Sequence, residues 1–271
     1  MDPDSIMTLR EALSHRKPKP TVLNDTEPGR VLTEDSQFSF HAESITQWVH
    51  AENITRWEEF RIDRLVQQFG AVLNSKAPEA SVLRQDQELS DIHIRSPTDF
   101  ARLVQWHDEI IKATLPFAME KLNLLPGLGV ATKVDQDALI YGDGVTTKAD
   151  HVIMLDRAVP EYLVVGHIRP ASMFNATRVF CAPRHINKQE IEALALLASS
   201  CKAAKTRYGY ILTDRDLVVC RFFKGASERM KTALMRVPWS TSYPHLTTQM
   251  ALWWLCIIAL SGDRQIRREG E

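Results

Sequence analysis

Cysteine is scarce in this sequence, and no two cysteines are spaced as a metal-binding pair. Cys181, Cys201, Cys220 and Cys256 lie far apart and form no CxxC motif. This spacing argues against a zinc site or a disulfide framework and favours free thiols in a reducing compartment. We therefore expect a cytoplasmic protein.

Long apolar runs are also missing. The longest, residues 250–260, is too short to span a bilayer and is typical of a buried helix. Residues 1–9 carry acids and no apolar run, which disfavours a secretory signal. We therefore expect no contact with a membrane, while the oligomeric state stays open. The composition, 44% hydrophobic and 25% charged, is that of an ordinary globular domain.

The charge is distributed unevenly along the chain. Residues 181–271 hold 14 Lys and Arg against 8 Asp and Glu, a net charge of +6, whereas the whole chain has a net charge of -1. A basic segment of this kind can face a polyanion such as a nucleic acid. The sequence has no dense stripe of basic residues interleaved with aromatics, so an ordinary solvated surface explains the asymmetry equally well.

The chain divides into an N-terminal arm and one domain. Residues 1–40 are polar and proline-containing without sustained periodicity, and they predict a flexible arm with a basic stretch at 15–19. Residues 41–271 predict a single α/β domain. From residue 43 to residue 73, apolar residues recur at helical spacing, which predicts one or two amphipathic helices with Glu58 and Glu59 on a charged face.

Strands and helices alternate through the rest of the domain. Helices are predicted from residues 97–99 onward, from Asn187 to about Lys205, and over 246–260. Strands are predicted over 127–132, 138–141, 151–155, 162–165, 207–213 and 217–223, the last two as a hairpin. Central strands with helices before, between and after them predict an α/β (α+β) fold, with a central mixed sheet flanked by helices.

The clearest functional signal is an acidic residue on one apolar run and a polar triplet at the end of the next. Asp150 precedes the run at 151–155, and His167-Ile168-Arg169 ends the run that begins at Tyr162. In a metal-dependent nuclease the triplet would be acid-x-Lys, and two acids would hold Mg²⁺. His167 therefore stands in place of the second acid, and Arg169 in place of the lysine.

These replacements change the chemistry that the three residues allow. A neutral imidazole suits softer metals than Mg²⁺, and an arginine stays protonated, so it can clamp an anion but cannot act as a base. We therefore expect no metal and no cofactor. Asp150, His167 and Arg169 can still grip an anion and move a proton. Each of them alone also fits a structural role, in a turn, inside the sheet or at a strand end.

Longer segments of the chain resemble fungal proteins with a PD-(D/E)XK nuclease-like core. The segments that carry this resemblance are 207–219, 237–239 and 246–255, within a likeness that covers roughly 50–260. It pairs Lys148-Ala-Asp-His151 with the family's Arg/Lys-Pro-Asp-Trp segment, and Gly166-His-Ile-Arg169 with its Gly-Asp-Thr-Lys segment. The resemblance implies a restriction-endonuclease-like core.

The same resemblance implies further positions. Thr55-Arg-Trp-Glu-Glu59 would match an earlier helical segment of the family, and Leu196 stands where a glutamine often sits on the following helix. Three of the four motif positions are changed, and Asp150 alone is retained. The changed positions include those on which the metal chemistry of the family depends.

The chain is also similar, in size and in its C-terminal segments, to fungal arginine-containing cyclodipeptide synthases. That resemblance implies two aminoacyl-tRNAs as substrates, one of them arginyl-tRNA, and a diketopiperazine product. Activated esters need an oriented amine and a proton acceptor, and no metal. Asp150, Glu58 or Glu59 would hold the guanidinium, and His167 would move the proton. The residues that could contact the substrate are Lys148, Lys202, Lys205, Arg207, Tyr208 and Tyr210, although helix-end and sheet-packing roles fit several of them equally.

Two other functions stay open. One is a metal-dependent nuclease in which another acid has moved in for the one lost at His167, and the other is an inactive nuclease core that binds nucleic acid. We rank the aminoacyl-tRNA-dependent synthase first. The changed motif lacks the second acid and the lysine that a nuclease needs for its metal ion, but it keeps polar groups in place.

Overall fold

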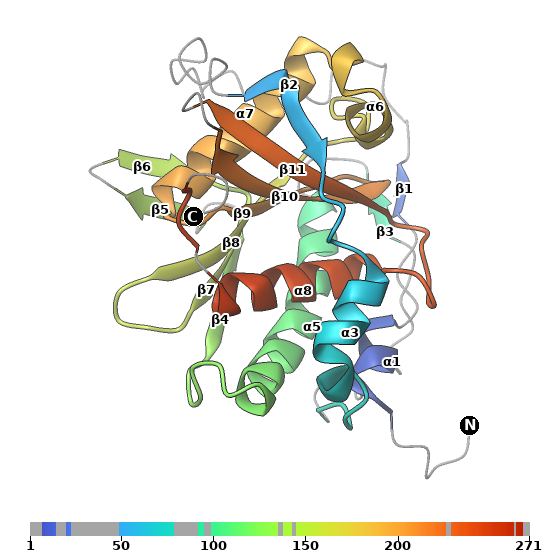
Figure 1. Ribbon diagram of the computed structural model, residues 1–271, viewed down its shortest axis with the longest axis vertical. Helices are drawn as coiled ribbons and strands as arrows, with labels where there is room; N and C mark the ends of the chain where they lie inside the picture. The colour runs from blue at the N-terminus through green and yellow to red at the C-terminus, as the bar shows by residue number, and fades with distance from the viewer. Residues whose placement is uncertain are drawn as a thin grey trace.

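The computed structural model describes residues 7–14, 20–22, 49–78, 92–94, 99–134, 138–142, 145–225, 229–262 and 264–267. A seven-stranded sheet runs through its centre (Figure 1). Its strands are β2 (Val49–Arg56), β4 (Val130–Val134), β7 (His151–Leu155), β8 (Glu161–Ile168), β9 (Tyr208–Leu212), β10 (Asp216–Lys224) and β11 (Met230–Pro238). Their order across the sheet is β2-β11-β10-β9-β8-β7-β4. The sheet is mixed, because β8 pairs with β9, and β11 with β2, in parallel.

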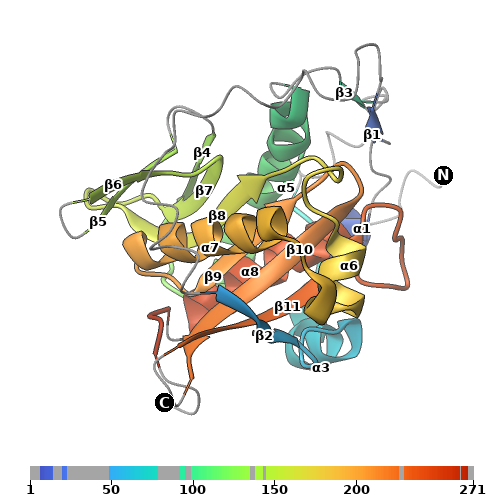
Figure 2. The same cartoon turned by 90° about the horizontal axis from the view of Figure 1, so that it is seen from above.

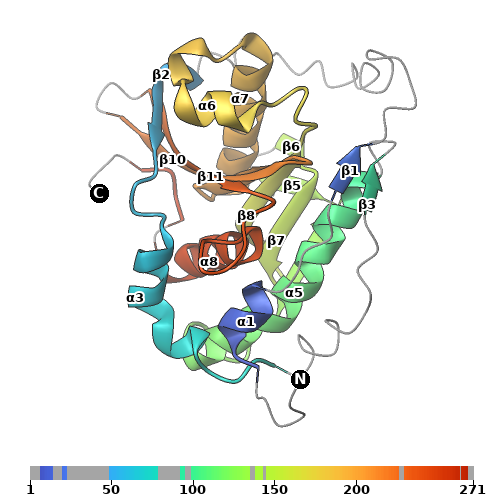
Figure 3. The same ribbon diagram turned by 90° about the vertical axis from the view of Figure 1, so that its right-hand side faces the viewer.

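Helices cover both faces of the sheet, as Figures 2 and 3 show. One face carries α6 (Ala176–Cys181), the short 3-10 helix η3 (Pro183–His185) and α7 (Lys188–Ala203). The other face carries α1 (Leu9–Ser14), α3 (Ile62–Leu73), α5 (Phe100–Lys121) and α8 (Thr248–Ser261). Each face has its own hydrophobic core. Two small sheets complete the fold, β1 (Pro20–Val22) with β3 (Ile92–Ile94) and β5 (Leu139–Gly142) with β6 (Val145–Lys148).

Helix α7 connects the parallel strands β8 and β9 and crosses between them. Its first turn is fixed by a capping box, in which the Asn187 side chain accepts from Glu190 N and the Glu190 carboxylate accepts from Asn187 N. Its other end is tied to the sheet, because Thr206 Oγ1 donates to the carbonyl of Leu163. Gly209 lets α7 approach the sheet closely, since a Cβ there would lie 2.8 Å from Cys201 Sγ.

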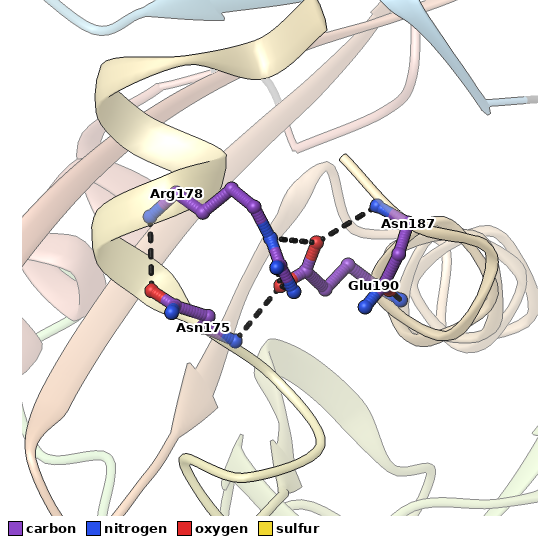
Figure 4. Close-up of polar contacts among 4 residues, drawn as sticks. All are labelled: Asn175, Arg178, Asn187 and Glu190. Atoms are coloured by element: carbon purple, nitrogen blue, oxygen red, sulfur yellow. Dashed lines mark hydrogen bonds and ion pairs between the residues drawn. The ribbon is translucent and has the colours of Figure 1, made fainter. Parts of the chain in front are cut away.

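The buried carboxylate of Glu190 joins α6 to α7 (Figure 4). Glu190 is fully buried, and its two oxygens accept hydrogen bonds from the Arg178 side chain and from the backbone N–H groups of Asn175 and Asn187. Asn175 caps α6 by accepting from Arg178 N. Because a carboxylate buried in the protein needs several donors to offset its lost hydration, this clamp fixes the relative placement of the two helices.

Most of the elements predicted from the sequence are confirmed. The fold is mixed α/β, with the predicted central sheet and flanking helices. Helices α5, α7 and α8 and strands β4, β5, β7, β8, β9 and β10 lie where the patterns place them, whereas β6 and β11 were not predicted. Trp253 and Trp254 are buried on α8. No helix within the described residues has both the length and the apolar character needed to cross a membrane.

Two sequence predictions need correction. The helical spacing over 43–73 predicts one or two amphipathic helices, but Val49–Arg56 is strand β2, paired in parallel with β11, and helix begins only at Ile62. Residues 1–40 predict a flexible arm, yet within that range α1 buries Leu9 and Leu13 completely in the core. The structure of both segments depends on contacts with residues distant in the sequence, and the local spacing of apolar residues does not reveal these contacts. The basic stretch at 15–19 lies outside the described residues.

Candidate functional site

Asp150, His167 and Arg169 meet at one end of the sheet. Asp150 directly precedes β7, while His167 and Arg169 lie at the end of the neighbouring strand β8. Asp150 Oδ2 accepts hydrogen bonds from Ile168 N at 2.8 Å and from Arg169 Nη1 at 3.0 Å, and it lies 3.4 Å from His167 Nδ1. The antiparallel pairing of the two strands therefore brings together the three residues singled out from the sequence.

Ser200 completes this group and was not predicted from the sequence. It is buried on the inner face of α7, and its Oγ lies 3.0 Å from His167 Nε2. The imidazole thus has a carboxylate at one nitrogen and a hydroxyl at the other. These partners favour a proton on Nδ1, with Nε2 accepting from the serine hydroxyl. A polar residue on the otherwise apolar face of the predicted helix was the signal available for Ser200.

Exposure is graded across the site. The side chains of Asp150 and Arg169 are 31% and 26% exposed, whereas that of His167 is 3% exposed. Ser200 has no exposed surface. Solvent therefore reaches Asp150 and Arg169, and His167 and Ser200 lie buried behind them.

The environment moves the pKa values of both titratable groups downward. Burial alone would raise the pKa of Asp150, but His167, the Arg169 guanidinium and the Ile168 N–H overcome it and hold that pKa far below 3.8. Burial lowers the pKa of His167 below 6.5, against the opposing effect of Asp150. At neutral pH the site therefore holds an ionised carboxylate beside a neutral imidazole.

His167 should give the protein a dependence of stability on pH. Because burial depresses its folded-state pKa, the unfolded chain binds more protons once the pH falls below about 6.5. The stabilisation from the neutral imidazole is complete above that pH and is lost as the pH falls toward the folded pKa. We expect His167→Gln to flatten the decline of the free energy of unfolding between about pH 6.5 and 5. Urea unfolding at several pH values measures this slope.

The exposed His185 on η3 provides a control for that experiment. His185→Gln should keep the wild-type slope. Parallel stability curves for the wild type and His167→Gln would contradict the account of a buried neutral imidazole.

The predicted basic contacts are spread over β6, the end of α7 and the start of β9. Lys148 ends β6, two residues before Asp150, and is half-buried. Lys202 and Lys205 are exposed at the C-terminal end of α7. Arg207 donates through Nε to the Tyr208 hydroxyl, and its guanidinium lies 5.3 Å from the centre of that ring. Lys148 is therefore the predicted contact nearest in sequence to the site, and substrate contact by all four stays a prediction.

The structure does not bring Tyr208 and Tyr210 to Asp150. Both side chains are 1% exposed and belong to the core beneath α5 and α8, on the face of the sheet opposite α7. The Tyr210 hydroxyl bonds to His151 Nδ1 instead. Their alternation along β9 reflects sheet packing, as one of the two interpretations predicts.

Glu58 and Glu59 are also placed elsewhere. They lie exposed in the turn after β2, and not on a helix face as the spacing predicts. Strand β2 is an edge strand and stands four places from β8, which corresponds to roughly 20 Å at the usual spacing of neighbouring strands. Neither glutamate can therefore share a substrate group with Asp150 in this arrangement.

The donor set fits a divalent cation poorly. Across the described ranges, no group of three or more His, Cys, Asp or Glu side chains could hold a metal ion. The carboxylate of Asp150 is already paired with Arg169, whose charge would repel a cation. The two acids at the turn between β9 and β10 are occupied as well, because Asp214 accepts from Ala171 N and Asp216 pairs with Arg236 at 2.7 Å.

Comparisons with known proteins give no family for this chain. No protein-family model matches it, and no curated protein matches it.

Proposed function

We propose that this protein is an aminoacyl-tRNA-dependent cyclodipeptide synthase that makes an arginine-containing diketopiperazine. The observation that carries the proposal is the carboxylate–imidazole pair of Asp150 and His167, reachable at its carboxylate end and paired with Arg169 in place of a metal ligand set. This arrangement suits a reaction that moves a proton from an amine and needs no bound cation.

The chemistry follows from the two aminoacyl esters. The α-amino nitrogen of one aminoacyl group attacks the ester carbonyl of the other, and the carbon–oxygen bond to the tRNA ribose breaks. The amine proton passes to the Asp150 carboxylate and then to the departing ribose oxygen. A second attack, by the remaining amine on the remaining ester, closes the six-membered ring and releases the second tRNA.

Each residue of the site has a part in this scheme. Asp150 is ionised and can hold the attacking ammonium before it loses its proton. The neutral imidazole of His167 faces the carboxylate with its Nδ1–H, 3.4 Å away, and can hold it in place for the proton transfer. Arg169 uses one nitrogen on Asp150 and on the carbonyl of Ile168, and a guanidinium has further N–H groups that can stabilise negative charge on the ester oxygen.

A PD-(D/E)XK-like origin of the scaffold is part of the proposal. The order of β7 with Asp150 before it, β8 ending in the altered triplet, and α7 following supports this origin. The basic C-terminal third, with a net charge of +6 over 181–271, supports contact with a tRNA backbone.

Purified protein incubated with arginyl-tRNA and a mixture of other charged tRNAs tests the proposal. We expect a cyclic arginine dipeptide, detected by its mass, and none when the tRNA is deacylated beforehand. A folded protein that forms no such product, but cleaves plasmid DNA or RNA with Mg²⁺ or Mn²⁺, would favour the nuclease. Salt-dependent binding of nucleic acid without any turnover would favour the inactive binding module.

Ser200 should support His167 without being the nucleophile, because its hydroxyl is buried. We expect Ser200→Ala to lower the rate of product formation about tenfold, the effect of losing one hydrogen bond. Steady-state rates of purified variants measure this, with the half-buried neighbour Ser199→Ala as the control. Complete loss of product in a folded Ser200→Ala would instead indicate that Ser200 takes up the aminoacyl group.

A further inference from the structure

A second polar network lies on the opposite face of the sheet. The Tyr210 hydroxyl bonds to His151 Nδ1, and His151 Nε2 lies 2.7 Å from Asp108 Oδ1. The other oxygen of Asp108 accepts from Thr132 Oγ1 at 2.8 Å. His151, Asp108 and Tyr210 are all buried, in the core beneath α5 and α8. Burial raises the pKa of the Tyr210 hydroxyl well above 10, so it stays a hydrogen-bond donor.

A glycine makes this network possible. His151, Gly166 and Tyr210 are aligned across three neighbouring strands, since Gly166 is the register partner of both. The Tyr210 ring crosses over Gly166 to reach His151, and a Cβ at position 166 would collide with that ring. Gly166, the first residue of the Gly-His-Ile-Arg segment, must therefore lack a side chain, because the Tyr210 ring fills the space that a Cβ would occupy.

The two networks share a backbone. Asp150 and His151 are adjacent residues, and so are Gly166 and His167, and alternate residues of a strand point to opposite faces. Asp150 N donates to the carbonyl of Gly166 at 3.2 Å. A shift of His151 or Gly166 on one face therefore moves Asp150 or His167 on the other.

We propose that Tyr210, together with His151 and Asp108, is a positioning device for the Asp150–His167 pair. The inference rests on the proposed function for its catalytic consequence, but its structural part stands on the geometry alone. A network whose members lie in β7, β9 and α5 fixes the two peptide units that carry the site. Groups that orient functional residues without touching substrate commonly change activity about tenfold or more when removed.

Amide hydrogen exchange tests this without any need for activity. Tyr210→Phe removes one hydroxyl and keeps the ring, and we expect exchange at Asp150 N–H and Ile168 N–H to quicken about tenfold. Exchange at amides in the centres of β10 and β11 should be unchanged. Tyr208→Phe is the matched control, because Tyr208 is equally buried on the same strand and face but contacts Arg207 in place of His151. Gly166→Ala, which displaces the ring, should reproduce the effect of Tyr210→Phe.

A second readout separates positioning from general stability. The rate of cyclic-dipeptide formation should fall about tenfold in Tyr210→Phe, with KM unchanged. In a protein that already carries Asp150→Asn, adding Tyr210→Phe should not lower the rate further. Unaltered exchange at Asp150 and Ile168, or equal acceleration at the β10 and β11 amides, would overturn the positioning role. If the wild type makes no cyclic dipeptide, the proposed function fails while the exchange result still decides the positioning role.

Discussion

Replacing Glu190 with alanine should destabilise the protein by about 3 kcal/mol, because it removes the partner of several buried donors at once. The Arg178 side chain and the backbone N–H groups of Asn175 and Asn187 would lose their acceptor. Arg178 is 38% exposed and can turn to water, which places the effect at the lower end of the range for a broken buried ion pair. Urea unfolding, followed by tryptophan fluorescence, measures the change.

A matched control lies one half-turn along the same helix. Glu192 pairs with Lys188 at 3.6 Å on the surface, and such pairs contribute about 0–1 kcal/mol. Glu192→Ala should therefore leave the urea midpoint nearly unchanged. Equal midpoints for Glu190→Ala and Glu192→Ala would contradict the role of Glu190 as the clamp between α6 and α7.

Asp150→Asn should lower the rate of cyclic-dipeptide formation by about 100-fold or more while the protein stays folded. Asparagine keeps the shape of the side chain, but it is uncharged and cannot take a proton from an amine. Arg169 and Ile168 N–H would also face a neutral group in place of an ionised one. Initial rates with purified variants measure the loss.

Asp156→Asn is the control for that substitution. Asp156 follows β7 at its other end and is exposed, so its replacement should leave the rate unchanged. An Asp150→Asn rate within twofold of the wild type would remove Asp150 from the reaction, and with it the observation on which the proposed function depends.

The core of the site could be predicted because strand pairing is a local consequence of the sequence. Two apolar runs joined by a short polar link predict neighbouring strands, and this alone brings Asp150 next to His167 and Arg169. Ser200 could not be placed in the same way. Its contact with His167 depends on how α7 rotates over the sheet, and helical spacing does not fix that rotation.

The error at β2 has a different cause. Ile54, Trp57 and Phe60 recur at helical spacing, but the backbone over 49–56 pairs with β11, which lies some 180 residues later in the chain. The glutamates after β2 consequently sit in a turn at the sheet edge, away from Asp150. The direction of the Tyr210 side chain could not be predicted from the sequence either, because it depends on the open space over Gly166 on the neighbouring strand.

Comparative mass spectrometry of yeast cells that express the wild type, Asp150→Asn or Asp156→Asn shows whether Asp150 serves aminoacyl transfer. We expect a cyclic arginine dipeptide in cells with the wild type or Asp156→Asn, and none in cells with a folded Asp150→Asn. The mass of the product would also identify the second amino acid. Absence of the product from all three, with each protein folded, would contradict the claim that Asp150 serves aminoacyl transfer.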